Sequence, residues 1–102
     1  MTSDSFTRFV RDQLAGIESL RLRRMFGGQG LYWGEHFFGL IFDDRLYFKT
    51  NERTRKIYEA RGMPVFQPNE RQTLKHYFEV PAEVVENQSQ LFEWAREAAS
   101  IS

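Results

Sequence analysis

A cluster of glycines inside a run of strand-forming residues constrains this chain more than any other feature. Residues 24–34 read Arg-Met-Phe-Gly-Gly-Gln-Gly-Leu-Tyr-Trp-Gly and include four of the seven glycines. Aromatic and branched residues favour strands, whereas glycine is normally depleted there. The cluster therefore predicts a β-bulge that bends one long strand over residues 20–33. Gly27, Gly28 and Gly30 are the predicted structural glycines of this strand.

A glycine cluster can also cradle a phosphate with its backbone amides. Such a loop needs a strand before the glycines and a helix N-terminus after them. Here both flanks of residues 27–30 have the composition of strands, and no Gly-Lys-Ser/Thr sequence follows. The sequence thus favours a structural role for the glycines over a ligand-binding loop.

The N-terminal half is predicted to contain one helix and a hairpin besides the bent strand. Apolar residues at helical spacing predict a helix over residues 4–16, with Ser3 as its N-cap and Gly16 at its end. The apolar stripe of this helix comprises Phe6, Phe9, Val10, Leu14 and Ile17. Residues 36–42 and 45–49 flank the turn-forming pair Asp43-Asp44, so they predict a β-hairpin.

The C-terminal half predicts two helices and two strands. Asn51 caps a helix over about residues 52–61, and Gly62 ends it. Residues 65–66, between Pro64 and Pro68, are typical of an edge strand. Residues 74–80 alternate as a half-exposed strand, with Leu74, His76, Phe78 and Val80 on one face. Val84 and Val85 fall in a helical turn, and a last helix carries Leu91, Phe92, Ala95 and Ala98 on one stripe.

This order, α-β-β-β-α-β-β-α, predicts a two-layer α+β fold in which helices cover one face of an antiparallel sheet. With 102 residues the chain is expected to form a single domain over residues 1–102. There is no cysteine, which excludes disulfides and thiolate chemistry. The N-terminus lacks the basic and apolar regions of a signal peptide, and no apolar run is long enough to span a bilayer. We therefore expect a cytoplasmic protein without a membrane partner.

No set of residues predicts catalysis, a metal or a cofactor. His36 lies in a predicted turn, and His76 lies on the apolar face of a strand, where it is expected to be partly buried. Neither histidine has a second ligand at metal-binding spacing. Asp43 and Asp44 are interpreted as turn formers. The chain is thus not expected to be an enzyme.

Charge is balanced overall, because the formal net charge is zero, but it is segregated along the chain. Residues 53–75 are mainly basic and residues 79–97 mainly acidic. These segments predict two solvated faces of opposite charge. Such faces also suit self-association as a homodimer or the binding of an outside partner.

Basic residues also interleave with aromatic ones, which leaves open a nucleic-acid-binding face in which bases stack on exposed rings. The simpler interpretation is that Phe points inward and Arg or Lys outward. Zero net charge argues against a general polyanion binder. Residues expected to project from the sheet form the candidate interaction face: Arg24, Tyr32, Tyr47, Lys49 and Tyr77.

Several segments together resemble the N-terminal domain of the TfoX/Sxy family. The most specific is Met-Phe-Gly-Gly-Gln-Gly at residues 25–30; the others are residues 38–49, 54–55, 62–66, 77–81 and 91–98. The resemblance implies a fold like that of the secretion chaperones. It also implies a bacterial, non-enzymatic regulatory or protein-interaction module, similar to competence co-regulators that help to switch on DNA-uptake genes. Its partner would be a protein, such as the transcription machinery. The longer regulators carry a further C-terminal helical domain, so a stand-alone N-terminal domain is expected here.

Overall fold

The computed structural model describes residues 3–101 and shows an α+β fold. The helices are α1 (Asp4–Gln13), α2 (Glu52–Ala60), α3 (Ala82–Val85) and α4 (Gln88–Ala99). The strands are β1 (Leu20–Met25), β2 (Gly28–Trp33), β3 (His36–Phe42), β4 (Arg45–Lys49), β5 (Val65–Asn69) and β6 (Gln72–Glu79). They form one antiparallel sheet in the order β1-β2-β3-β4-β6-β5. The predicted fold class is confirmed.

The glycine-rich stretch forms a hairpin turn, so the predicted bulge within one long strand is wrong. Met25 pairs with Gly28, and the two residues between them, Phe26 and Gly27, have φ values of 54° and 81°. Two consecutive positive φ values are typical of the type I′ turn, which matches the twist of the flanking strands. The predicted meander of three strands therefore has four, β1 to β4.

Two of the predicted structural glycines are required by close contacts rather than by φ. A Cβ atom on Gly28 would overlap the carbonyl oxygen of Ile41 on β3. A Cβ atom on Gly30 would lie 2.8 Å from the side chain of Met25 and 3.1 Å from the ring of Phe37. The lack of a side chain at Gly28 and Gly30 thus lets these residues of β2 lie close to β1 and β3, and Gly27 forms the turn.

The helix ends follow local sequence signals, with one exception. The Ser3 side chain accepts a hydrogen bond from the Phe6 N–H, and Asn51 and Thr54 form a reciprocal capping box at the start of α2. Gly62 closes α2 at a φ of 71°, as predicted. α1, however, ends at Gln13 rather than at Gly16, because the following residues turn inward to bury Leu14 and Ile17.

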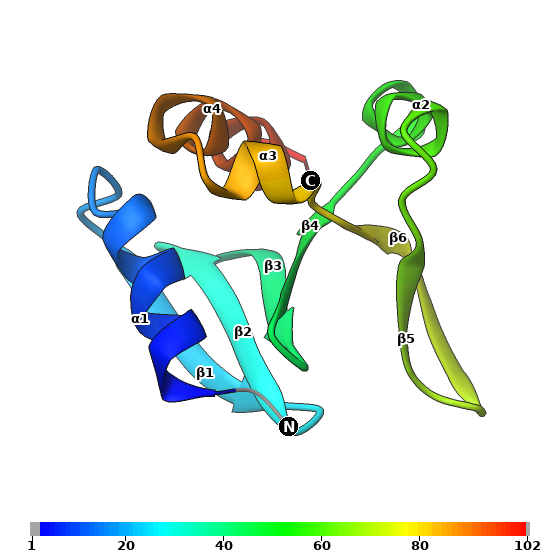
Figure 1. The fold of residues 1–102 in the computed structure, drawn as a ribbon, viewed down its shortest axis with the longest axis horizontal. Coiled ribbons are helices and arrows are strands. Elements are labelled where there is room, and N and C mark those ends of the chain that lie inside the picture. The colour runs from blue at the N-terminus through cyan, green and yellow to red at the C-terminus, as the bar shows by residue number, and fades with distance from the viewer. Residues whose placement is uncertain (1–2, 102) are drawn as a thin grey trace.

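The main hydrophobic cluster lies on the helix side of the sheet. Buried residues of all four described helices contribute to it, including Val10, Tyr58, Val84 and Leu91. They pack against strand residues such as Phe48. Figure 1 shows α3 and α4 above β3 and β4, while the β5–β6 hairpin descends below α2. Helices on one face of the sheet are thus confirmed.

The opposite face of the sheet is also packed, which the sequence did not predict. A second cluster comprises the buried residues Leu40, Tyr47, Phe66 and Tyr77, with Met25, Phe37, Phe42 and Leu74 against it. The ring of Phe26, at the tip of the β1–β2 hairpin, lies 5.8 Å from that of Phe66 on the far edge strand β5. The sheet therefore curls until its two ends touch, and its concave face is filled by side chains.

The prediction that the apolar residues of β6 share one face is wrong. The pairing of β5 with β6 changes register, with Val65 opposite Phe78 but Phe66 opposite Leu74. Leu74 consequently belongs to the second cluster, whereas Phe78 belongs to the main one. His76 is exposed, so the prediction that it is partly buried is wrong.

Candidate functional site

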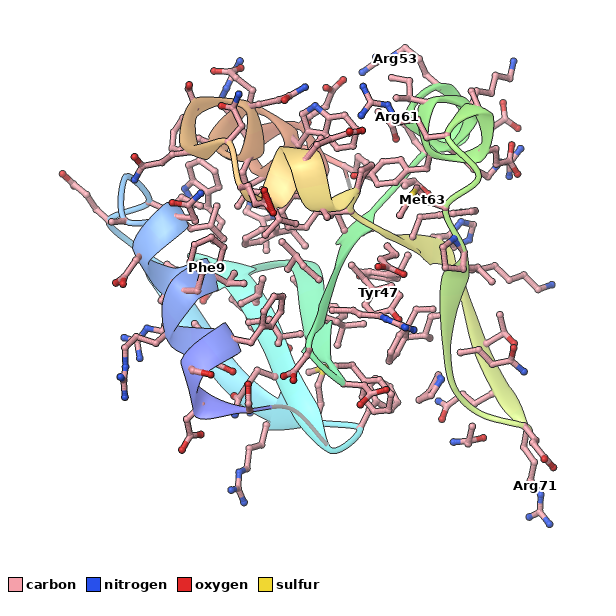
Figure 2. The ribbon with its side chains drawn as sticks, viewed as in Figure 1. Phe9, Tyr47, Arg53, Arg61, Met63 and Arg71 are labelled. Atoms are coloured by element: carbon pink, nitrogen blue, oxygen red, sulfur yellow. The ribbon has the colours of Figure 1, made fainter. Side chains whose placement is uncertain are left out.

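The five residues of the predicted interaction face do not form one exposed surface. Tyr47 and Tyr77 are only 6% and 8% exposed, because the curled sheet encloses them in the second cluster. Figure 2 shows Tyr47 between β4 and β5. Burial, followed by the nearby Tyr32, raises the pKa of Tyr77 to about 12. These two tyrosines are therefore packing residues in this conformation and do not project from the sheet.

The other three residues lie apart from one another. Arg24 is exposed and lines a hollow beside Asp4 and Thr7 of α1, on the helix side of the sheet. Lys49 is half-buried, and its Nζ donates to the Ile101 carbonyl oxygen at 3.5 Å. Tyr32 is half-buried on the concave face. The role of these residues in binding stays a prediction, but a partner cannot contact all five at once on a rigid surface.

Few rings of the concave face are free for bases to stack on. The ring of Phe37 is 5.1 Å from that of Tyr32 and 5.3 Å from that of Tyr77, so the three rings pack in a row. The ring of Phe66 lies 4.8 Å from that of Tyr47. A ring that is covered on both sides offers no platform for a nucleotide.

The basic and acidic segments pair with each other within the chain. Arg53 of α2 forms an ion pair with Glu97 of α4, and Arg61 forms one with Glu83 of α3 at 3.1 Å. Figure 2 shows both arginines at the α2 end of the molecule. These pairs are exposed, and each contributes at most about 1 kcal/mol. They do, however, reduce the free positive charge that residues 53–75 offer to nucleic acid.

No group of three or more metal-binding side chains occurs within residues 3–101. His36, at the start of β3, and His76 are both exposed. Asp43 and Asp44 form the predicted turn, with φ values of 52° and 58°. Asp44 also accepts hydrogen bonds from the Ser3 backbone N–H at 2.7 Å and hydroxyl at 2.9 Å, which lower its pKa. No local pattern in the sequence indicates this contact between the N-cap of α1 and the turn between β3 and β4.

A groove of about 250 Å³ separates α1 from α3 above the start of β4. Its apolar wall consists of Phe6, Phe9, Leu46, Val80, Ala82 and Val85. Its rim carries Asp44, Arg45, Glu79 and Glu86, so acids outnumber the one base. Phe9 is 41% exposed on α1, which Figure 2 labels. The groove is smaller than the cavities of about 300–1,000 Å³ that hold most small-molecule ligands, and it fits one or two side chains.

Phe9 was expected in the core, and its exposure has a geometric cause. Successive residues of a helix are about 100° apart, so Phe9 lies on the border of the stripe centred on Val10. Val10 is fully buried in the main cluster, whereas Phe9 extends into the groove. An apolar residue at the edge of a helical stripe is the only sequence signal that could have indicated this site.

A comparison with protein families identifies the chain. The family model of the TfoX N-terminal domain matches residues 12–101. This chain belongs to the TfoX N-terminal domain family. The match covers nearly all of the 102 residues and includes the Gly27 hairpin, the second cluster and α3, which forms one wall of the groove. No curated protein matches the sequence. None of the helices in residues 3–101 is long and apolar enough to cross a membrane.

Proposed function

We propose that this TfoX N-terminal domain is a non-enzymatic regulatory module that acts by binding another protein through the α1–α3 groove. The observation that carries the proposal is the exposed Phe9 ring beside an apolar wall of the groove. Exposed aromatic side chains in a concave site are the usual anchors of protein interfaces. The partner would be a component of the transcription machinery, as the family resemblance implies for competence genes.

The chemistry of the groove narrows the kind of partner segment that fits. An aliphatic or aromatic side chain would enter between Phe6 and Val85, where it would be removed from water. A Lys or Arg next to it would meet the rim carboxylates Asp44, Glu79 and Glu86. We therefore infer a partner segment that combines one apolar anchor with a neighbouring positive charge.

A nucleic-acid-binding function has less support from these contacts. Arg53 and Arg61 already have carboxylate partners, and the Arg61 guanidinium lies 5.3 Å over the ring of Trp94. Tyr47 and Tyr77 are not exposed for stacking. Protein binding through the groove requires no rearrangement of these groups.

The proposal is tested in cells from which the gene has been deleted and then restored as a variant. Phe9→Ser should fail to restore transcript levels of DNA-uptake genes, because it removes the anchor of the groove. Ile57→Ser is the matched control, since Ile57 is 42% exposed but lies on α2, away from the groove. It should restore transcription. Both variants must accumulate to the wild-type level.

Two results would contradict the proposal. One is full restoration of the transcripts by Phe9→Ser. The other is a deletion that leaves transcripts of DNA-uptake genes unchanged under conditions that induce them. Either result would show that this chain does not regulate DNA-uptake genes through the groove.

A further inference from the structure

β1 is an edge strand, because no strand formed by residues 3–101 lies beside its outer side. In the sheet order it comes first, and its partner in the described part of the chain is β2. An edge strand presents N–H and C=O groups in a row, which can pair with an extended segment of another chain.

The register of the β1–β2 hairpin identifies these groups. Residues of an antiparallel pair alternate between bonding to the partner strand and pointing away from it. Met25 and Gly28 close the turn, and the Ser19 carbonyl oxygen accepts from the Gly34 N–H at 3.2 Å at the other end. Odd-numbered residues of β1 thus bond to β2. The N–H and C=O groups of Leu22 and Arg24 point outward, and no turn or side-chain hydrogen bond in residues 3–101 uses them.

The side chains of this edge are strongly basic. Arg21, Arg23 and Arg24 are exposed, and β1 contains no acidic residue. None of the three forms an ion pair with any residue between 3 and 101, in contrast to Arg53 and Arg61. The Arg23 guanidinium lies 5.8 Å over the ring of Tyr32, which holds it on the concave side of the strand. The positive charge of β1 is therefore available to an outside partner.

A second copy of this chain does not suit the edge. Antiparallel pairing of β1 with itself about Leu22 would place Arg21 opposite Arg23, and like charges directly opposite each other destabilise a strand pair. The other edge strand, β5, has no acidic residue to face these arginines. It also contains Pro68, which lacks an N–H group for pairing. The charges favour a different chain with acidic side chains.

We propose that β1 binds an extended acidic segment of a partner protein as an added strand of the sheet. Acidic residues of the segment would lie opposite Arg21 and Arg23, on the concave side. An apolar residue would lie opposite Leu22, which is half-buried on the helix side. The predicted pattern is therefore acidic–apolar–acidic. The proposal shares with the proposed function only the premise that this chain binds proteins, and it uses a surface separate from the groove.

The probe is a fluorescent peptide, Val-Glu-Val-Glu-Val-Glu-Val, titrated with the full chain at low salt and followed by anisotropy. Its valines face Leu22 and Arg24, so their N–H groups bond to β1, whereas the N–H groups of its glutamates point away. Methylating the valine nitrogens should abolish binding, and methylating the glutamate nitrogens should preserve it. Arg23→Glu should weaken binding about fivefold to tenfold, because an attractive cross-strand pair becomes repulsive. Higher salt should also weaken it.

Two variants serve as controls. Arg71→Glu makes the same charge change at the tip of the β5–β6 hairpin, where Figure 2 shows Arg71 pointing away from the molecule, and should leave the affinity unchanged. Phe9→Ser should also leave it unchanged, so failure of the groove and failure of the edge are distinguishable. Circular dichroism confirms that each variant is folded.

Three results would overturn the proposal. The first is no binding of the peptide at low salt. The second is an equal effect of the two methylation patterns, which would indicate attraction of charges without strand addition. The third is tighter binding of a single-stranded oligonucleotide of the same charge that Arg23→Glu abolishes, which would assign these arginines to nucleic acid.

Discussion

Replacing Phe66 by alanine tests whether the second cluster is a true part of the core. The Phe66 side chain is fully buried, and its ring lies 5.8, 5.3 and 4.8 Å from those of Phe26, Phe42 and Tyr47. Removing a buried phenylalanine ring costs about 3–5 kcal/mol. Within residues 3–101, β5 pairs only with β6, so the site can partly collapse, and we expect a loss of about 3 kcal/mol.

Urea unfolding followed by tryptophan fluorescence measures this loss. Trp33 and Trp94 pack against the main cluster, on the other side of the sheet, so they report whether the change affects the whole fold. With a urea dependence of about 2 kcal/mol per molar, a loss of about 3 kcal/mol lowers the midpoint by about 1.5 M. A single domain of this size has only about 5–15 kcal/mol of stability, so the effect is large.

Two further substitutions serve as controls for Phe66→Ala. Phe66→Leu keeps most of the apolar volume and should cost about 1 kcal/mol. Phe9→Ala removes the same ring from a position that is 41% exposed and should cost less than about 1 kcal/mol. If Phe66→Ala lowers the midpoint no more than Phe9→Ala, the concave face is not packed in solution as the structure shows.

Two other predictions concern the turn and the tyrosines. Gly28→Ala should destabilise the fold by about 1–3 kcal/mol in the same assay, because its Cβ would overlap the Ile41 carbonyl oxygen. Gly27→Asn should cost less than about 1 kcal/mol, and equal losses for the two variants would contradict the register of this hairpin. Stability should also fall as pH rises from 10 towards 12, since burial raises the pKa of Tyr77 from 10.0 to about 12 and burial, followed by Glu97, raises that of Tyr58. The folded state then keeps protons that the unfolded state loses, so this stabilisation is complete below pH 10 and is lost progressively as the pH rises through the pKa of the folded state. A urea midpoint that stays constant from pH 9 to 12 would contradict this.

Features set by neighbouring residues could be predicted from the sequence. The caps Ser3 and Asn51, the Asp43-Asp44 turn and the Gly62 stop each depend on a few adjacent residues, and the structure has all of them. The β1–β2 turn is also local, but its first residue is Phe26. A bulky side chain at positive φ is unusual, so the sequence lacked the Asn-Gly or Asp-Gly signal of such a turn.

Features that depend on distant contacts could not be predicted in this way. Alternation correctly separates Tyr47 from the helix-facing residues of β4, but it does not show that Phe66 comes to cover it. The exposure of Phe9 likewise depends on where α3 lies, more than 70 residues further along the chain. Periodicity assigns a residue to a face, whereas the curvature of the sheet decides whether that face is open.

The curl of the sheet has a consequence for how the chain is made. Strands β1, β2 and β3 each pair with the next strand along the chain, whereas β4 pairs with β6 rather than with β5. Phe66 contacts Phe26 across 39 intervening residues. Contacts between near residues form faster than contacts between distant ones. Residues 20–49 leave the ribosome before Phe66 does, because they lie nearer to the N-terminus. Until β5 arrives, Phe37 and Phe42 lack their cover, so the growing chain exposes an apolar sheet face that the finished protein conceals.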